Sequence, residues 1–141
     1  MACVRGADSG GGARLRLGVG DAVDRSTPVQ IPTLSNIVSI ATGLGHVLAL
    51  RVDGKVFAWG DNAFGQLGLG DVIGRTTPVD TGLSRVKAIA AGASHSLARP
   101  GGGGTKATGN NFSGQPGIGR TEDHTQTWPD AGTPPPAKAT A

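Results

Sequence analysis

The chain has 141 residues, among them 25 glycines and 9 prolines, with 16% charged residues and a net charge of +3 at pH 7. This length fits one ordinary domain at most, and so much glycine favours short strands with tight turns over long helices. The single cysteine, Cys3, excludes an internal disulfide framework and a zinc cluster of thiolates. The arginines are scattered without a run of like charge, so binding to nucleic acid is not expected.

The N-terminal segment carries no targeting signal that the sequence reveals. No apolar run approaches the roughly 18 residues that span a bilayer, which argues against a membrane protein. The opening residues also lack the apolar core of a secretory signal, so the chain is expected in the cytoplasm if Met1 is its true start. We expect residues 1–13, which include Cys3, to form a disordered tail. Arg5, Arg14 and Arg16 are too few to indicate DNA or chromatin binding.

The middle of the chain reads as a series of short strands separated by turn signals. The dipeptide Asp53–Gly54 is a strong hairpin signal between two of them. Proline at Pro28 and Pro78 is typical of an edge strand, which can spare a hydrogen-bond donor. The expected strands are, in chain order, 28–31, 36–42, 46–52, 55–60, 78–80 and 85–91.

The same pattern occurs twice, about fifty residues apart. "LGVGDAVDRSTPV" (Leu17 to Val29) returns as "LGLGDVIGRTTPV" (Leu67 to Val79), with eight of thirteen positions identical. "LSNIVSIATGLGHVLAL" (Leu34 to Leu50) returns as "LSRVKAIAAGASHSLAR" (Leu83 to Arg99). Units of this length with four strands each are typical of propeller blades.

The glycine run "WGDNAFGQLGLG" (Trp59 to Gly70) has two interpretations. Its spacing suggests a phosphate-binding P-loop, but the places that should hold Lys and Ser or Thr hold Gln66 and Leu67. The run also returns as "TGNNFSGQPGIG" (Thr108 to Gly119), whereas a phosphate cradle is made once. We therefore expect a turn whose glycines supply positive φ angles.

These observations predict an all-β chain, an incomplete β-propeller of two four-stranded blades in an open arc with irregular tails. The repeats are expected to cover 14–119, with the two blades at about 36–80 and 85–129. The second blade reads as degenerate, because "RPGGGGTKATG" (Arg99 to Gly109) replaces strand, turn and strand with glycine and polar residues. Residues 120–141, which are rich in Pro and Ala, are expected to be mostly disordered.

The unit "GLGDVIGRTTPV…LSRVKAIAAGASHSLA" joined to "DGKVFAWGDNAFGQLG" closely resembles the repeat of the regulator of chromosome condensation family. The resemblance implies a seven-bladed β-propeller whose shared theme is protein binding. A photoreceptor of this family uses Gly-Trp-Arg-His-Thr, and the matching places hold Leu44 and Ala93, which disfavours light sensing. The residues of the repeat signature are Gly43, His46, Trp59, Gly60, Asn62, Gly65, Gln66, Gly68, Gly70, Asp71, Arg75, Pro78, Gly92 and His95.

None of the candidate chemical groups indicates catalysis. His46 and His95 recur without a repeating carboxylate or thiolate, so we expect structural histidines that bond backbone and no metal site. Asp71 with Arg75, like Asp21 with Arg25, is expected to tie its loop to the neighbouring blade.

Three further residue types also read as structural. Asn62 and Asn110 read as turn residues whose side chains bond backbone. Trp59 reads as core, and Ser94 and Ser96, which flank a histidine, lack the partners of a catalytic triad. We expect no enzyme and no cofactor.

The sequence leaves two function classes open. The first is a noncatalytic protein-interaction module, a fragment of or contributor to a propeller scaffold. The second, implied by the resemblance, is guanine-nucleotide exchange on a small GTPase. The expected partner is a protein, and the bare flanks of a two-blade arc also predict self-association through the open blade edges.

Overall fold

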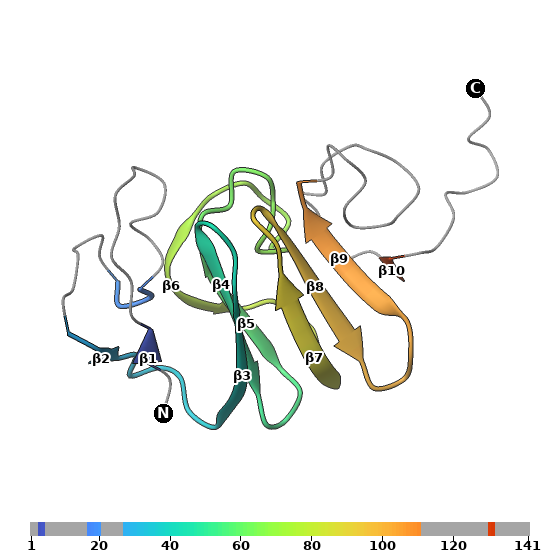
Figure 1. The fold of residues 1–141 in the computed structure, drawn as a ribbon, viewed down its shortest axis with the longest axis horizontal. Helices are drawn as coiled ribbons and strands as arrows, with labels where there is room; N and C mark the ends of the chain where they lie inside the picture. Colours follow the sequence, from blue (N-terminus) through green and yellow to red (C-terminus); the bar gives the residue numbers. More distant parts are fainter. Residues whose placement is uncertain (1–2, 5–16, 21–26, 111–129, 132–141) are drawn as a thin grey trace.

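The computed structural model describes residues 3–4, 17–20, 27–110 and 130–131, and within them every regular element is a β-strand. Figure 1 shows two larger antiparallel sheets side by side and a small two-stranded sheet near the N-terminus. The strands are β1 (Cys3–Val4), β2 (Val29–Gln30), β3 (Ile37–Thr42), β4 (His46–Arg51), β5 (Val56–Gly60), β6 (Arg75–Asp80), β7 (Val86–Ala91), β8 (His95–Pro100), β9 (Thr105–Gly109) and β10 (Asp130–Ala131).

The two larger sheets have four strands each, in the orders β3-β4-β5-β6 and β10-β9-β8-β7. Within each sheet, strands that follow one another in the chain pair as antiparallel neighbours, as in a propeller blade. The all-β, incomplete-propeller prediction is thereby confirmed. Pro78 lies in β6, at the outer edge of the first sheet, where its missing N–H costs no ladder bond inside the sheet.

The strand connections fall at two opposite ends of the blades. The β3–β4 turn (43–45), the β5–β6 loop (61–74) and the β7–β8 turn (92–94) lie together, and we name this side the loop end (Figure 1). The β4–β5 hairpin (52–55) and the β8–β9 hairpin (101–104) lie at the other side, which we name the hairpin end.

The second blade is more regular than its sequence suggests. The glycine and polar residues after Arg99 were expected to replace strand, turn and strand, but β8 continues to Pro100 and β9 forms at Thr105–Gly109. Backbone groups carry the β8–β9 ladder, so polar side chains do not prevent pairing, and threonine suits a strand. Moreover, Ala107 and Thr108 of β9 are fully buried.

The ends of the chain also contribute strands. Cys3 and Val4, expected in a disordered tail, pair with Gln30 and Val29. Asp130 and Ala131 pair with Lys106 and Thr105, so the fourth strand of the second blade lies just beyond the expected boundary at residue 129. The remaining residues of both expected tails, and the pair Asp21–Arg25, lie outside the described residues.

The face between the two blades holds the main core. Leu48, Leu50, Val56 and Ala58 of the first blade are buried in one cluster with residues from the second blade and from the β5–β6 loop. Those other members are Val86, Ala98 and Leu67. Because β7 packs against β3 and β4, each blade covers an apolar face that its neighbour could not bury alone.

The opposite face of the first blade packs on the N-terminal segment. Trp59 is fully buried there with Ile31, Leu34, Val47 and Ala49. Gly18, with φ +73°, lies so close that an added Cβ would stand 2.7 Å from the indole Nε1 of Trp59. The N-terminal segment therefore covers the first blade as the β5–β6 loop covers the second.

Among the described residues, two that are not glycine have left-handed backbone conformations, and they occupy equivalent places before β3 and β7. Asn36 has φ +56° and Arg85 has φ +57°. Their carbonyls accept bonds from Val52 N at 2.9 Å and from Gly101 N at 2.8 Å, which fixes each strand to its hairpin. Asparagine tolerates this conformation, whereas arginine has no such preference.

We therefore expect Arg85→Asn to raise the free energy of unfolding by about 0.5–1 kcal/mol, since it relieves backbone strain. The reciprocal change, Asn36→Arg, should lower it by a similar amount. Urea unfolding of both variants and the parent chain is the measurement. A destabilised Arg85→Asn would contradict the strain argument.

Candidate functional site

The glycine run after β5 forms a loop of tight turns. Gly60, Gly65, Gly68 and Gly70 have φ of +106°, +73°, +68° and +86°, a conformation that favours glycine at each place. At Gly60 an added Cβ would also overlap the carbonyl of Gly45. The glycines thus satisfy backbone geometry, and nothing in their positions requires a phosphate.

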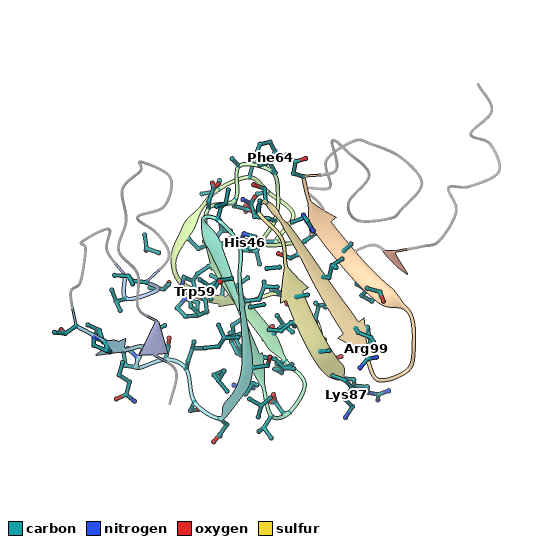
Figure 2. The ribbon with its side chains drawn as sticks, in the orientation of Figure 1. His46, Trp59, Phe64, Lys87 and Arg99 are labelled. Carbon is teal, nitrogen blue, oxygen red and sulfur yellow. The ribbon has the colours of Figure 1, made fainter. Side chains whose placement is uncertain are left out.

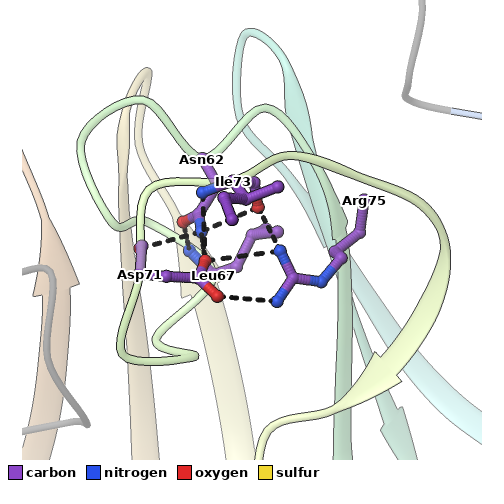
Figure 3. Close-up of polar contacts among 5 residues, drawn as sticks. All are labelled: Asn62, Leu67, Asp71, Ile73 and Arg75. Atoms are coloured by element: carbon purple, nitrogen blue, oxygen red, sulfur yellow. Dashed lines mark hydrogen bonds and ion pairs between the residues drawn. The ribbon is translucent and has the colours of Figure 1, made fainter.

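Asn62, fully buried, is the centre of this loop (Figure 3). Its Nδ2 donates to the carbonyls of Asp71 at 3.0 Å and Ile73 at 3.1 Å and to Asp71 Oδ1 at 2.9 Å. Its Oδ1 accepts from Leu67 N at 3.0 Å. One amide therefore joins the start, the middle and the end of the loop, and fixes Leu67 in the core between the blades.

Asp71 and Arg75 close the same loop from its far side. Arg75 Nη2 donates to Asp71 Oδ2 at 2.8 Å, and Arg75 Nη1 donates to Asp71 Oδ1 at 3.3 Å and to the Ile73 carbonyl. The guanidinium of Arg75 and the Ile73 N–H lower the pKa of Asp71, with a smaller contribution from Asn62. This pair was expected to tie the loop to the neighbouring blade; it instead ties the loop to itself, because the two residues are four apart on one turn.

Backbone and hydroxyl groups make the connection between blades. Ser96 Oγ donates to the carbonyl of Gln66 at 2.7 Å, and Thr108 Oγ1 donates to the carbonyl of Gly65 at 2.9 Å. In the repeat, Ser96 and Thr108 stand where the first unit has Val47 and Trp59. Thr108 belongs to the run that suggested decay, and it nevertheless binds the loop of the preceding blade, as Ser96 does. A change from apolar to polar at a buried repeat position is the signal that could have found them.

His46 takes part in this connection. Its Nε2 lies 2.8 Å from Ser96 Oγ, and because the serine hydrogen is directed at Gln66, Nε2 is the donor. We expected a bond to backbone, and the His95 backbone does act on the ring; the bond to a side chain of the next blade is an additional contact that the sequence did not predict. The ring packs against Gly43, where an added Cβ would overlap it, and His95 packs against Gly92 in the same way.

Burial keeps His46 neutral at pH 7. Burial lowers the pKa of His46 to about 4, against smaller upward effects of the His95 backbone and the Asp61 carboxylate and a small downward effect of His95 itself. Its buried Nδ1 has no hydrogen-bond partner within the described part of the chain. Partial burial also lowers the pKa of His95. In residues 17–20 and 27–110, no group of three or more His, Cys, Asp or Glu could hold a metal ion.

Apolar side chains gather on the connections at the loop end. Leu44 of the β3–β4 turn is 70% exposed, and Phe64, Val72 and Ile73 of the β5–β6 loop are 36%, 52% and 65% exposed. Phe64 projects at the tip of this end (Figure 2). The Asn62 and Asp71 bonds fix the β5–β6 loop, and Leu44 N donates to the Ala93 carbonyl at 2.9 Å, so these four residues, which we name the loop-end patch, stand on a rigid support. Sequence reasoning missed the patch, because exposure of a loop side chain is set by the fold.

Asn62→Asp tests the loop network. Aspartate keeps the shape but cannot donate from Oδ2, and it places a second carboxylate beside Asp71. We expect a loss of roughly 3 kcal/mol or more in the free energy of unfolding, because three bonds are lost in a buried site. Asp61→Asn, a change of the same kind next to it, should cost under about 1 kcal/mol. Urea unfolding of both variants decides, and equal effects would contradict the role of Asn62.

The lowered pKa of His46 predicts how the stability of the chain depends on pH. Its folded pKa, about 4, lies below the ordinary value of 6.5, so the unfolded chain binds the proton more readily. The contribution of His46 to the free energy of unfolding, on the order of 3 kcal/mol, is therefore complete above pH 6.5 and is lost as the pH falls towards 4. His46→Gln should flatten this part of a stability–pH curve, whereas His95→Gln should leave most of it. An unchanged slope in His46→Gln would show that other groups cause it.

Comparison with known proteins shows which families and proteins the chain is similar to. A family model described as "Regulator of chromosome condensation (RCC1) repeat" matches residues 9–50 and 53–99, and a second model of the same description matches 37–66. The chain is 42% identical over 66 residues to the ultraviolet-B receptor of Arabidopsis thaliana, covering 45% of this chain and 15% of the receptor. It is 42% identical over 66 residues to the X-linked retinitis pigmentosa GTPase regulator of Mus musculus, covering 45% of this chain and 7% of the regulator.

A solved structure supports the same relationship. Prp20p of Saccharomyces cerevisiae, described with its binding properties to Gsp1p and histones, superposes with a TM-score of 0.70 and 32% identity, covering 80% of this chain and 28% of Prp20p. This chain thus spans less than a third of each of these proteins. No helix among the described residues is long and apolar enough to cross a membrane. With matched repeats over more than half its length and two blades of the same topology, the chain belongs to the regulator of chromosome condensation repeat family.

Proposed function

We propose that this chain is a noncatalytic protein-interaction module that binds its partner through the loop-end patch. The observation that carries the proposal is the exposure of Phe64, Val72 and Ile73 on a loop held by buried hydrogen bonds, with Leu44 exposed on the β3–β4 turn at the same end. Exposed apolar groups on a rigid support bind a protein surface without a large loss of conformational entropy. The relatives support the proposal, since Prp20p is described by what it binds.

The polar groups of the repeat signature serve the fold. Asn62, Asp71, Arg75 and His46 are each engaged with other residues of the loop or of the next blade. A catalytic group must instead present a reactive atom to a substrate. This use of the polar groups supports a noncatalytic role.

A photo-crosslinking residue at position 64 or 73 tests the loop-end patch in the full chain. We expect a covalent adduct with a discrete partner protein from both positions, since both side chains face solvent at the loop end. The same residue at position 77, exposed on the outer strand β6, is the matched control and should give none. Adducts of equal yield from all three positions, or from none, would contradict the proposal.

The second candidate function is guanine-nucleotide exchange on a small GTPase, and the retinitis pigmentosa GTPase regulator among the relatives is what favours it. Release of a fluorescent GDP from a panel of small GTPases separates the two candidates. We expect no acceleration, because exchange requires groups that open a nucleotide site and the loop-end patch offers apolar contacts alone. Acceleration of about tenfold or more would favour the second function.

Self-association is the second kind of binding that the open arc supports. On the outward face of the second blade a shallow pocket of about 190 Å³ is lined mainly by Ala88, Ile89, Ala90 and Leu97, where a third blade would pack. Light scattering on the samples used for the exchange measurement should therefore show oligomers that increase with concentration.

A further inference from the structure

The hairpin end carries a groove between the two blades. It has a volume of about 260 Å³ and is lined by side chains of both blades, chiefly Val38, Arg51, Val52, Arg85 and Lys87. The groove has fixed walls, because the β4–β5 hairpin is bonded to the start of β7: Val86 N donates to the Gly54 carbonyl at 3.0 Å. An added Cβ on Gly54 would stand 2.8 Å from Arg85 Cα, so the two blades approach as closely here as glycine allows.

One cation of the groove is neutralised within the chain. Arg51 donates from Nε to Asp53 Oδ1 at 3.0 Å and from Nη2 to Asp53 Oδ2 at 2.7 Å. This bond lowers the pKa of Asp53 to about 2, so the carboxylate is fully ionised at neutral pH. The guanidinium of Arg51 also lies over the ring of Phe57, 5.2 Å from its centroid. The charges of Arg51 and Asp53 therefore cancel, and the pair forms a neutral wall of the groove.

Two other cations at the groove have no such partner. Arg85 and Lys87 are exposed, and within the described residues neither forms an ion pair. The nearby carboxylate of Asp80 is directed at Lys55, 3.7 Å from its ammonium. The groove therefore has a net positive charge that described carboxylates do not compensate.

The positive charge continues onto the second blade. Arg99, near the end of β8, lies beside Lys87, near the start of β7 (Figure 2), and its Cα partner across the ladder is Ala88, next to Lys87. The Lys87 stem rests on the β8–β9 hairpin, since an added Cβ on Gly101 would stand 3.0 Å from its Cε. Arg85 and Lys87 line the groove, and Arg99 extends the positive charge from Lys87 towards the outward face of the second blade; we name these three exposed cations the basic row.

Apolar side chains flank the basic row. Val38 of β3 is 61% exposed and Val52 of the hairpin is 67% exposed, both at the groove. A ligand of the groove must therefore satisfy cations and also cover aliphatic groups. An acidic peptide with aliphatic side chains offers both, whereas a nucleic acid offers phosphates and flat bases and, apart from the thymine methyl, no apolar side group.

We propose that the groove at the hairpin end binds an acidic protein segment, whose carboxylates contact the basic row and whose aliphatic side chain packs on Val38 and Val52. The proposal rests on the proposed function as an interaction module and gives it a second surface with a partner of defined chemistry. The second surface lies at the opposite end of the blades from the loop-end patch, so the two can be tested separately (Figure 2).

Fluorescence anisotropy with the full chain tests the proposal. The probe is a labelled peptide of Asp and Glu residues around a central Leu–Leu pair. We expect saturable binding that weakens as ionic strength rises, because the contacts are charged and exposed. A peptide with Ser–Ser in place of Leu–Leu should bind several-fold more weakly, since it leaves Val38 and Val52 uncovered. Absence of saturable binding to the Leu–Leu peptide would overturn the proposal.

Variants of the chain locate the site. Lys87→Glu combined with Arg99→Glu should weaken binding about tenfold or more, because each change replaces attraction with repulsion. Arg85→Asn should also weaken binding even though it relieves backbone strain, so loss of folding cannot explain that result. Lys55→Gln removes a cation whose charge Asp80 already compensates and should leave binding unchanged. Full binding by the Lys87/Arg99 double variant would overturn the proposal.

Single-stranded DNA of the same length as the peptide decides the class of partner. The proposal expects it to bind more weakly than the Leu–Leu peptide at equal ionic strength. Tighter binding of DNA would replace the peptide with a nucleic acid and overturn the proposal. Crosslinking at positions 64 and 73 reads out the loop end alone, so failure of the groove and failure of the proposed function give different results.

Discussion

A blade of this fold has two apolar faces and cannot cover either one itself. Leu48, Leu50 and Val56 on one face need the second blade, and Trp59 on the other needs the N-terminal segment. The conformation of the β5–β6 loop follows from this requirement. The loop between β5 and β6 must reach forward, insert Leu67 between the sheets and present its carbonyls to Ser96 and Thr108. Repeat proteins are stabilised by such neighbour contacts, and they lose stability where a neighbour is missing.

Because the loop extends between the sheets, it buries polar backbone groups, and residues of the same loop supply their hydrogen-bond partners. A loop of this length buries amides and carbonyls, and each unsatisfied one would cost roughly 1–3 kcal/mol. Asn62 satisfies two carbonyls and one N–H with a single side chain, and Arg75 adds a bond to the Ile73 carbonyl. The repeated Asn and Asp-x-x-x-Arg pattern is therefore a requirement of packing. The surface above it remains available for binding, which is where the loop-end patch lies.

The repeat was sufficient to predict the all-β architecture and the strands of the first blade, since strand periods, Asp53–Gly54 and the positive-φ glycines are local signals. Contacts between units were not local and could not be predicted. The bond from His46 to Ser96 joins residues fifty positions apart, and Asp71 could have reached either its own loop or the next blade. The strand at Thr105–Gly109 was missed because side-chain polarity was taken to prevent pairing that backbone groups make.

The sequence differences between the two units are of different kinds on the inner and the outward face of the second blade. On the face of the second blade that meets the first, Ser96 and Thr108 replace Val47 and Trp59, and both are buried and bonded to the preceding loop. On the outward face, Arg99 and Thr105 replace Leu50 and Val56 at the hairpin end. The inner replacements keep the blades joined, whereas the outer ones remove apolar area at one end and leave Leu97 at the other. Whatever packs on this face must therefore be apolar towards the loop end and accept a cation towards the hairpin end, a more selective surface than the one that the first blade presents to the second.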